Sequence, residues 1–341
     1  MPAETAISVV IITHARPELL RAFLDSAFSG GVQPLEYIIG VNGEDPASQR
    51  LLEEYKGRIK KVALSGMCRG EARACLAGRA LGRWLCFLDD DTVLPPGYFS
   101  RLAELIENNP DVSVFGGGQG LQPGAGYFES TVYSLLSSPW GGGPFTERFS
   151  PVQNTGRAGP EKFILCNLTL DGDFLRSHGF SFEGHLTSAE ENLLLNRMAR
   201  AGAKMVLSSS LNLIHRRRRD LGGFIRQVFG SGRGRAQISA LYRPACSRFT
   251  LLPPGALLLG AVLGITAPWL LAWTGALYMA VSLCAAALCG AAPAVKPAVF
   301  ALFPALHAAY AAGWLYGAVE VLFENILRRP RPGRCRCEEK P

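Results

Sequence analysis

The stretch Trp84-Leu85-Cys86-Phe87-Leu88-Asp89-Asp90-Asp91-Thr92 places three acidic side chains directly after a continuous run of apolar residues. A short apolar run of this kind is typical of a strand that is buried on both faces of a parallel sheet. Ligands of such sheets bind in the crevice beyond the carboxyl ends of the strands. We therefore predict a strand over residues 84–88 and a ligand site at the three aspartates.

The residues around this stretch alternate between patterns typical of strands and of helices. A strand-like run over residues 7–12 precedes Arg16-Pro17-Glu18, which opens a helix because proline is favoured in the first helical turn. This alternation predicts an α/β fold with a Rossmann-like, mostly parallel sheet and helices on both faces. Further strands are predicted over residues 36–41, 61–64, 163–170 and 205–207, and further helices over residues 46–55, 71–81, 98–108 and 187–200.

One segment, from Phe115 to Pro160, lacks this regularity. It contains Gly116-Gly117-Gly118 and Gly141-Gly142-Gly143 and has few apolar residues at periodic positions. We therefore predict long loops there, and long loops on an α/β scaffold often carry function.

The three aspartates have the chemistry of a cation site. Asp89 and Asp91 are one residue apart, and carboxylate oxygens are the ligands that Mg²⁺ or Mn²⁺ prefers, usually together with substrate phosphates. The alternative is a solvated acidic turn, but clustered like charges are unfavourable unless a cation neutralises them. The chain has a net charge of +7, so this acidic cluster is unusual in it. We predict metal and phosphate binding.

Four motifs, in order along the chain, carry a resemblance to a known family. They are Ser8-Val9-Val10-Ile11-Ile12-Thr13-His14-Ala15-Arg16, Gly70-Glu71-Ala72-Arg73-Ala74, Leu85-Cys86-Phe87-Leu88-Asp89-Asp90-Asp91, and Glu190-Glu191 followed by Arg197. Together they resemble the family 2 glycosyltransferases, which have the GT-A fold, and within them the membrane-attached bacterial type with C-terminal transmembrane helices. The resemblance covers roughly residues 6–235.

The resemblance implies inverting transfer of a sugar from a nucleotide-diphosphate sugar to an acceptor hydroxyl. It implies that Asp89, Asp91 and His215 hold Mg²⁺ or Mn²⁺ on the diphosphate, where the cation acts as a Lewis acid. For His215 the alternative is an ordinary surface histidine. The residues that the resemblance assigns to the nucleotide sugar are Thr13, Arg16, Asn42, Arg73, Asp89 and Asp90.

Two of these assignments depart from the family pattern or have a plainer alternative. Asn42 stands where the family usually has an acidic residue, and its amide can still hydrogen-bond a pyrimidine edge, which favours a UDP-sugar. Arg73 approaches the ribose or the diphosphate if the resemblance holds, and is otherwise a solvated charge on a helix.

The acidic pair Glu190-Glu191 corresponds to the catalytic pair of the family. An acceptor hydroxyl has a high pKa, so a carboxylate must accept its proton as the new bond forms. The resemblance places this role on Glu191, with Glu190 as the other candidate. Thr187-x-x-Glu190 and Ser188-x-x-Glu191 also fit helix capping boxes, so one glutamate can be a cap and the other the base.

The C-terminal part of the chain has the composition of membrane helices. No Lys, Arg, Asp or Glu occurs from Phe249 to Val295 or from Pro297 to Val319, and about 20 such residues span a bilayer core. We predict two crossings with a break near Trp273-Thr274-Gly275, and a third candidate that contains Glu320 and Gly313-x-x-x-Gly317, a spacing that permits close helix packing. A two-span topology stays open because the tail after residue 327 is basic, which favours the cytoplasmic side.

Other features bound the function further. Arg216–Arg219 can contact the diphosphate, attract anionic lipid headgroups or be solvated.

The N-terminus has no secretory signal pattern and the cysteines form no zinc pattern, so we expect a reducing cytosol and cysteines in the core. No G-x-G-x-x-G follows the first strand, no P-loop occurs, and no nucleic-acid-binding pattern accompanies the arginines.

These observations predict a membrane-anchored glycosyltransferase of the cytoplasmic (inner) membrane, multi-pass and involved in polysaccharide biosynthesis. Its partners are a nucleotide sugar, a lipid-linked glycan or polyprenyl acceptor and membrane lipids, without nucleic acid. The expected parts are a cytosolic GT-A domain (1–235), an interfacial linker (236–248), two or three transmembrane helices (249–326) and a basic tail (327–341). A polyprenyl-phosphate sugar synthase and a catalytically silent scaffold that binds nucleotide sugar are the alternatives.

Overall fold

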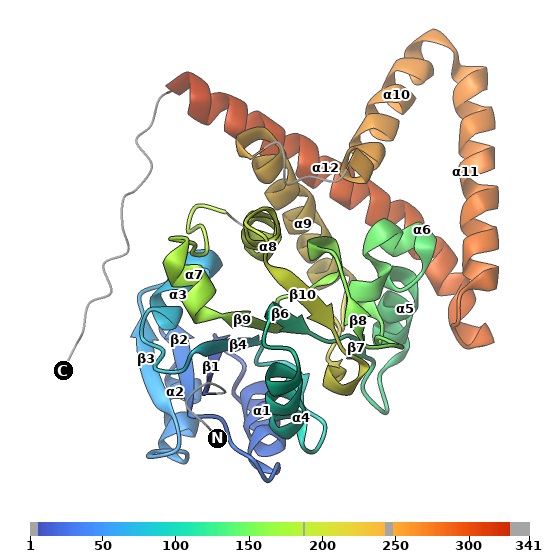
Figure 1. Ribbon diagram of the computed structural model, residues 1–341. Coiled ribbons are helices and arrows are strands. Elements are labelled where there is room, and N and C mark those ends of the chain that lie inside the picture. Colours follow the sequence, from blue (N-terminus) through green and yellow to red (C-terminus); the bar gives the residue numbers. More distant parts are fainter. Residues whose placement is uncertain (1–5, 187, 243–247, 328–341) are drawn as a thin grey trace. The chain divides into compact units, whose positions relative to one another are not determined.

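The computed structural model describes residues 6–186, 188–242 and 248–327 (Figure 1). The chain divides into two compact units. Among the described residues, the first unit contains those up to Gly120 and those within Pro151–Arg216, and the second contains Leu121–Ser150 and those from Arg217 to Leu327. Residues 243–247 of the expected linker and the expected tail from residue 328 lie outside the described residues.

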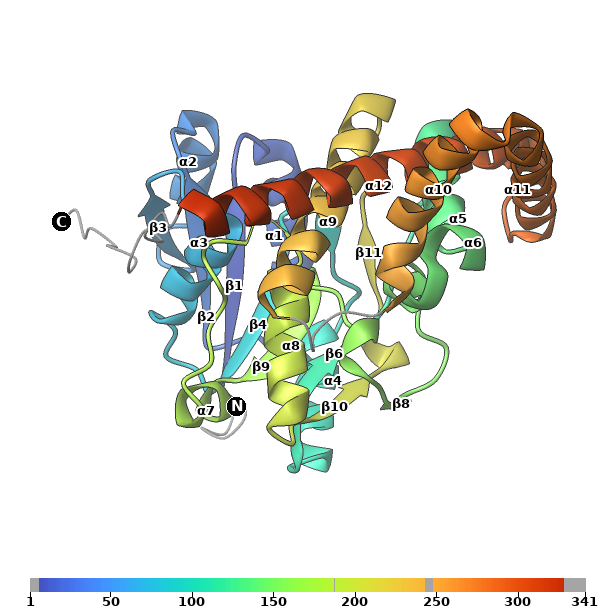
Figure 2. The same ribbon diagram turned by 90° about the horizontal axis from the view of Figure 1, so that it is seen from above.

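The first unit is built on a sheet of eight strands within the described residues, in the order β3-β2-β1-β4-β9-β6-β10-β8 (Figure 2). The pairs β1–β2, β2–β3, β1–β4 and β6–β10 are parallel. Strand β9 is antiparallel to both β4 and β6, and β8 is antiparallel to β10. The mostly parallel sheet is thus confirmed. The strands are β1 (Ile7–Thr13), β2 (Glu36–Asn42), β3 (Lys60–Leu64), β4 (Trp84–Leu88), β6 (Val112–Gly116), β8 (Gly156–Arg157), β9 (Asn167–Asp171) and β10 (Lys204–Leu207).

Helices cover both faces of this sheet, as expected. Successive residues of a strand point to opposite faces, so Val9 and Ile11 join one apolar core whereas Val10 joins the other. The first core is completed by α1 (Pro17–Phe28), α2 (Pro46–Glu53) and α4 (Tyr98–Asn108). The second is completed by α3 (Arg69–Ala77), α7 (Gly172–Ser177) and α8 (Glu190–Arg200).

The prediction of long loops between Phe115 and Pro160 was wrong. The segment contains α5 (Tyr127–Leu136), α6 (Pro139–Gly142), the 3₁₀ helices η2 (Gly143–Phe149) and η3 (Pro160–Lys162), and strands β6, β7 (Gln119–Gly120) and β8. Several of the glycines mark close packing instead of loops: a Cβ atom at Gly117 would lie 2.4 Å from the Leu211 carbonyl oxygen.

The strand predicted over residues 163–170 begins later, at Asn167. Phe163 and Leu165 are buried in the core, but they precede the strand. Their apolar side chains extended the pattern because burial alone does not distinguish a strand from an irregular segment.

The second unit contains α9 (Leu221–Leu241), η6 (Arg248–Leu251), α10 (Leu252–Thr266), α11 (Pro268–Leu288), η7 (Pro293–Val295) and α12 (Lys296–Leu327). Among the described residues, three helical segments are long and apolar enough to cross a membrane: Arg248–Thr266, Pro268–Leu288 and Pro293–Phe323. The break predicted at Trp273-Thr274-Gly275 was misplaced, since these residues lie inside α11. The chain turns at Ala267, which leaves the helical conformation (φ −152°, ψ 66°) because a residue before proline is disfavoured there.

Helix α12 packs directly along α9 through glycines. A Cβ atom at Gly313 would lie 2.1 Å from the Phe229 carbonyl oxygen, and one at Gly232 would lie 2.2 Å from that of Tyr310. The close packing expected of Gly313-x-x-x-Gly317 therefore occurs within the chain. Beside it Arg233 donates two hydrogen bonds to the Glu320 carboxylate, at 2.6 and 2.7 Å. Glu320 is thus paired with a cation of α9.

The arginine run is not uniformly solvated. Arg217 is buried and donates to the Phe149 carbonyl oxygen at 3.0 Å, with its guanidinium 5.5 Å from the centre of the Tyr133 ring. The solvated reading is therefore wrong for Arg217. Arg219 lies 3.7 Å from the Glu129 carboxylate.

Candidate functional site

A small sheet in the first unit assembles the acidic stretch with His215. Its strands are β5 (Thr92–Val93), β11 (Leu213–His215) and β7, in the order β5-β11-β7. His215 pairs with Thr92 across β5 and β11, which brings its Nε2 atom to 3.0 Å from Asp91 Oδ1. The Arg216 amide also donates to the Asp91 carbonyl oxygen. The histidine is thus fixed at the aspartates by strand pairing.

The other nitrogen of His215 is held from the opposite side. Its Nδ1 hydrogen-bonds the side-chain oxygen of Gln119, the first residue of β7. Burial opposes the charged ring, but the charges of Cys166 and Asp91 outweigh it and raise the pKa of His215 to about 10. A histidine whose Nδ1–H is taken by an amide oxygen directs Nε2 toward the site, and a metal that binds there would displace the Nε2 proton.

Thr13 and Arg16, at the end of β1, contact the same aspartates. Thr13 donates to Asp90 Oδ2 at 2.7 Å, and Arg16 Nη1 lies 3.4 Å from Asp90 and 3.1 Å from Asp91. Burial, followed by the charge of Asp91, raises the pKa of Asp90 to about 6. Asp90 therefore turns inward and orients the end of β1, whereas Asp91 faces His215.

Arg73 links the aspartates to the acidic pair of α8. It is 8% exposed, forms an ion pair with Glu190 and lies 3.5 Å from Asp89, so the solvated alternative for Arg73 was wrong. Burial raises the pKa of Glu190, although the Arg73 charge lowers it in part. Glu191 is also buried, and its Oε1 accepts a hydrogen bond from Asn192 at 2.8 Å.

The described residues do not form the alternative capping box. The residue before α8 is Ala189, and no side chain caps the helix there, so Ser188 is not at the N-cap. Thr187, the other candidate cap, lies outside the described residues. Glu190 and Glu191 occupy the first two positions of the helix, where its dipole favours carboxylates.

Two alanines beside these groups have a left-handed backbone. Ala15, between Thr13 and Arg16, has φ 53°, and Ala189, before the acidic pair, has φ 64°. A residue with a Cβ atom in this conformation costs about 1–3 kcal/mol and is found mainly where a ligand site requires it. The Ala15 amide is held by Asp45 Oδ2 at 2.7 Å. Both strained positions support the assignment of this region as a functional site.

Asn42, at the end of β2, has a different environment. Its Nδ2 donates to the Met67 carbonyl oxygen and its Oδ1 accepts from the Met67 amide, both at 2.9 Å. The side chain thus ties β2 to the segment that leads into α3. Both of its polar atoms are engaged by the backbone, so this geometry lends no support to recognition of a pyrimidine.

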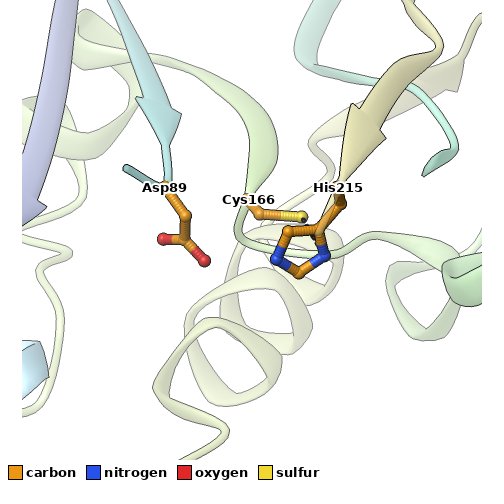
Figure 3. A group of neighbouring side chains, drawn as sticks. All are labelled: Asp89, Cys166 and His215. Carbon is orange, nitrogen blue, oxygen red and sulfur yellow. Dashed lines mark hydrogen bonds between the residues drawn. The ribbon is translucent and has the colours of Figure 1, made fainter. Parts of the chain in front are cut away.

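Cys166 and Gln119 were not among the residues expected at the site. One ligand atom each from Asp89, Cys166 and His215 lie within 4.8 Å of one another (Figure 3). Cys166 immediately precedes β9, whose first residue pairs with Leu88 at the end of β4. No cysteine spacing in the sequence could have revealed this, because the pairing of β9 with β4 brings the residues together. Carboxylate oxygens, a thiol and an imidazole that is held by a second hydrogen bond fit a divalent cation.

The second unit contains an apolar cavity of about 810 Å³. Arg235, whose guanidinium lies 4.3 Å from the centre of the Phe145 ring, is the cation in its lining. His307 joins the wall through the Trp140 carbonyl oxygen at 3.0 Å and the Tyr278 hydroxyl at 2.9 Å. The lining comes from residues 139–145, 249–257 and 304–311 together with Arg235 and Tyr278.

Comparison with known proteins shows where this chain is related to others. Residues 8–148 match the family model described as glycosyl transferase family 2. A curated relative, the glucosyl-dolichyl phosphate glucuronosyltransferase of Haloferax volcanii, is 30% identical over 119 residues. That match spans 33% of this chain and 37% of the relative.

One solved structure is similar in fold, and a second shows a weaker likeness. The mannosyltransferase PcManGT from Pyrobaculum calidifontis, in complex with GDP-Man and Mn²⁺, has a TM-score of 0.51 and 16% identity, covering 95% of this chain and 88% of its own. S. aureus TarS has a TM-score of 0.47 and 13% identity, covering 67% of this chain and 39% of its own, below the level at which we infer a shared fold. Residues 8–148 of this chain are therefore similar to glycosyl transferase family 2, and the first unit has an α/β sheet of the GT-A type.

Proposed function

We propose that the protein is an inverting glycosyltransferase that moves a sugar from a nucleotide-diphosphate sugar to a hydroxyl of a lipid-linked glycan. The observation that carries the proposal is the meeting of Asp89, Asp91 and His215 with two arginines, Arg16 and Arg73, in the family 2 region. Carboxylates and cationic side chains in one site fit a metal-bound diphosphate, since the carboxylates would hold a divalent cation and the arginines would offset the charge of the phosphates.

In this proposal the chain's own residues bind and orient the donor. Asp89, Asp91 and His215 hold Mg²⁺ or Mn²⁺, which when bound stabilises the charge on the leaving diphosphate. Arg16 and Arg73 lie beside the aspartates and orient the diphosphate through charge-assisted hydrogen bonds. The 2.7 Å hydrogen bond from Thr13 to Asp90 orients the end of β1.

Glu191 is the proposed base that accepts the acceptor's proton. Glu190 is held in an ion pair with Arg73, so it is the positioning member of the acidic pair. With a proton acceptor on α8 and the donor at the aspartates, the hydroxyl attacks the anomeric carbon and the nucleoside diphosphate departs with the electron pair of the broken bond.

The nucleotide and the acceptor are assigned by class. The PcManGT structure holds GDP-Man, and Asn42 is bonded to the Met67 backbone, so the preference for a UDP-sugar is without support. The name of the Haloferax volcanii relative describes transfer to glucosyl-dolichyl phosphate, a lipid-linked sugar, which supports an acceptor of that kind here.

Membrane attachment fits such an acceptor. Large apolar side chains are exposed on α10 and α11, with Ile265 87% and Trp269 63% exposed, as expected of helices that face lipid. We propose a multi-pass anchor in the cytoplasmic membrane, with the glycosyltransferase region on the cytosolic side and the domain boundaries at residues 235 and 248. We further propose that the product enters a surface polysaccharide.

The first experiment measures nucleoside diphosphate release by the detergent-purified chain across UDP-, GDP- and dTDP-sugars, with Mn²⁺ or Mg²⁺ and membrane lipid extract. We expect release with one donor. Donor binding without release from any of them would favour the silent scaffold.

Substitution of the proposed base is expected to separate the two catalytic alternatives. Glu191→Gln should lower kcat by about 10²-fold or more, because proton transfer by a placed carboxylate contributes about 10²–10⁴-fold. The donor KM should stay unchanged. Glu190→Gln serves as the comparison, and should instead raise the donor KM by releasing Arg73. Full activity of Glu191→Gln would point to a polyprenyl-phosphate acceptor, which needs no base.

The cavity of the second unit is the proposed seat of the acceptor's hydrocarbon chain, with Arg235 near its phosphate. Ala256→Trp should raise the acceptor KM by about 10-fold or more, since displacing only two buried CH₂ groups costs about 1.6 kcal/mol. The donor KM should not change. Ala261→Trp, on the same helix but exposed and outside the lining, is the matched control. Equal acceptor KM values for the two variants would contradict this assignment.

A further inference from the structure

Cys166 introduces a sulfur atom into a site whose other expected ligands are oxygen and nitrogen. It is a free cysteine, 1% exposed, immediately before the antiparallel strand β9. One ligand atom each from Cys166, Asp89 and His215 lie within 4.8 Å of one another. The sulfur also contacts the imidazole at 3.9 Å from Nδ1, the nitrogen that Gln119 holds. Figure 3 shows the sulfur beside the imidazole, with one ring nitrogen directed toward Asp89.

A spread of 4.8 Å between the three ligand atoms suits three ligands of one ion. Sulfur binds Zn²⁺ at about 2.3 Å and nitrogen or oxygen at about 2.0–2.2 Å, so two ligands of the same ion lie within about 4.5 Å of each other. The observed spacing requires side-chain shifts of only a few tenths of an ångström. Burial on its own would suit any core cysteine, but a core cysteine does not require a carboxylate and an imidazole within reach of its sulfur.

We propose that Cys166 is a ligand of the divalent cation, which makes the site selective for borderline and soft ions such as Zn²⁺, Co²⁺ and Cd²⁺ over Mg²⁺. Thiolate ligands favour such ions, whereas Mg²⁺ binds oxygen and keeps its water. The inference rests on the proposed function in one respect, since both place a cation between Asp89 and His215. It goes beyond that function by assigning a further ligand and a metal preference.

The test is a Cd²⁺ titration of the full-length protein in detergent, without donor or acceptor. A sulfur-to-cadmium charge-transfer absorption is expected, and Zn²⁺ should displace it because both ions occupy the same site. Cys166→Ser should abolish the displaceable band and weaken Zn²⁺ binding by about 10-fold or more, while Mg²⁺ binding changes little. Cys68→Ser, which removes an exposed cysteine of the same unit, is the control and should keep the band.

The outcomes separate this inference from the proposed function. A wild-type protein that binds Cd²⁺ without the band, yet catalyses Mn²⁺-dependent transfer, overturns the sulfur ligand and leaves the function standing. A displaceable band without transfer from any donor supports the ligand and counts against the function. If Cys166→Ser does not fold, as judged by thermal unfolding, cadmium NMR of the wild-type protein decides, because a bound sulfur moves the cadmium resonance far from that of an oxygen site.

Discussion

Asp91→Asn is expected to lower the rate of nucleoside diphosphate release by about 100-fold or more, with the protein still folded. Asp91 Oδ1 lies 3.0 Å from His215 Nε2 and its Oδ2 lies 3.1 Å from Arg16, so one carboxylate joins a proposed metal ligand to a proposed diphosphate ligand. An amide of the same shape removes the charge that binds the cation. A bound cation would stabilise the transition state by several kcal/mol. Each loss of about 1.4 kcal/mol lowers the rate tenfold.

The measurement is product release at saturating donor, together with the Mn²⁺ concentration for half-maximal rate, which should rise in the variant. Asp111→Asn is the matched control: Asp111 is a half-exposed aspartate of the same unit that pairs with Arg157 and Lys204, away from the strand ends that carry the site. Its activity should equal that of the wild type. Wild-type rates for Asp91→Asn, with the same Mn²⁺ dependence, would show that the cation does not bind at the acidic stretch.

Gly232→Ala is expected to destabilise the second unit by about 3 kcal/mol, because overpacking of a tight contact costs about 1–3 kcal/mol and here the obstacle is backbone. A methyl group at this position would lie 2.2 Å from the Tyr310 carbonyl oxygen and 2.9 Å from the Trp314 amide nitrogen. Neither atom can move away without a shift of α12 from α9. The expected result is a lower Tm in detergent and less monodisperse protein.

Gly230→Ala, two residues earlier on the same helix, isolates the packing effect. A Cβ atom at Gly230 meets nothing within 4 Å, so only helix propensity changes, and alanine is favoured over glycine by about 1 kcal/mol. We expect a Tm at or slightly above that of the wild type. A Tm for Gly232→Ala as high as that for Gly230→Ala would mean that α9 and α12 do not pack as closely as described.

Much of the fold of the first unit follows from local patterns. Buried strands such as β4 read as unbroken apolar runs, and the helices between them carry periodic apolar residues, so the elements and the layered arrangement could be predicted. The helices and strands of the segment after Phe115 could not be predicted in this way. Its glycines resemble turn residues in sequence, and only the approach of Gly117 to the Leu211 carbonyl shows that they are there for packing.

The acidic stretch was expected at the site because it ends a predicted strand, and His215 and Arg73 were expected there because the family resemblance assigns them. The contacts between these residues could not be predicted from the sequence. Arg73 meets Glu190, 117 positions later in the chain, and no spacing rule covers such a distance. The break between the first two apolar helices was misplaced for a related reason: the composition is uniform, and the turn depends on the single restriction that Pro268 imposes on Ala267.

The sequence by itself determined the alternation of strands and helices, the carboxylates at the end of a buried strand and the apolar C-terminal helices, because each depends on residues close together in the chain. Only the tertiary structure decided that Cys166 stands beside His215 and that Gln119 holds the same ring. Those contacts depend on the antiparallel register of β9 on β4 and the pairing of β11 with β7, and strand pairing is selected by the packing of the whole sheet.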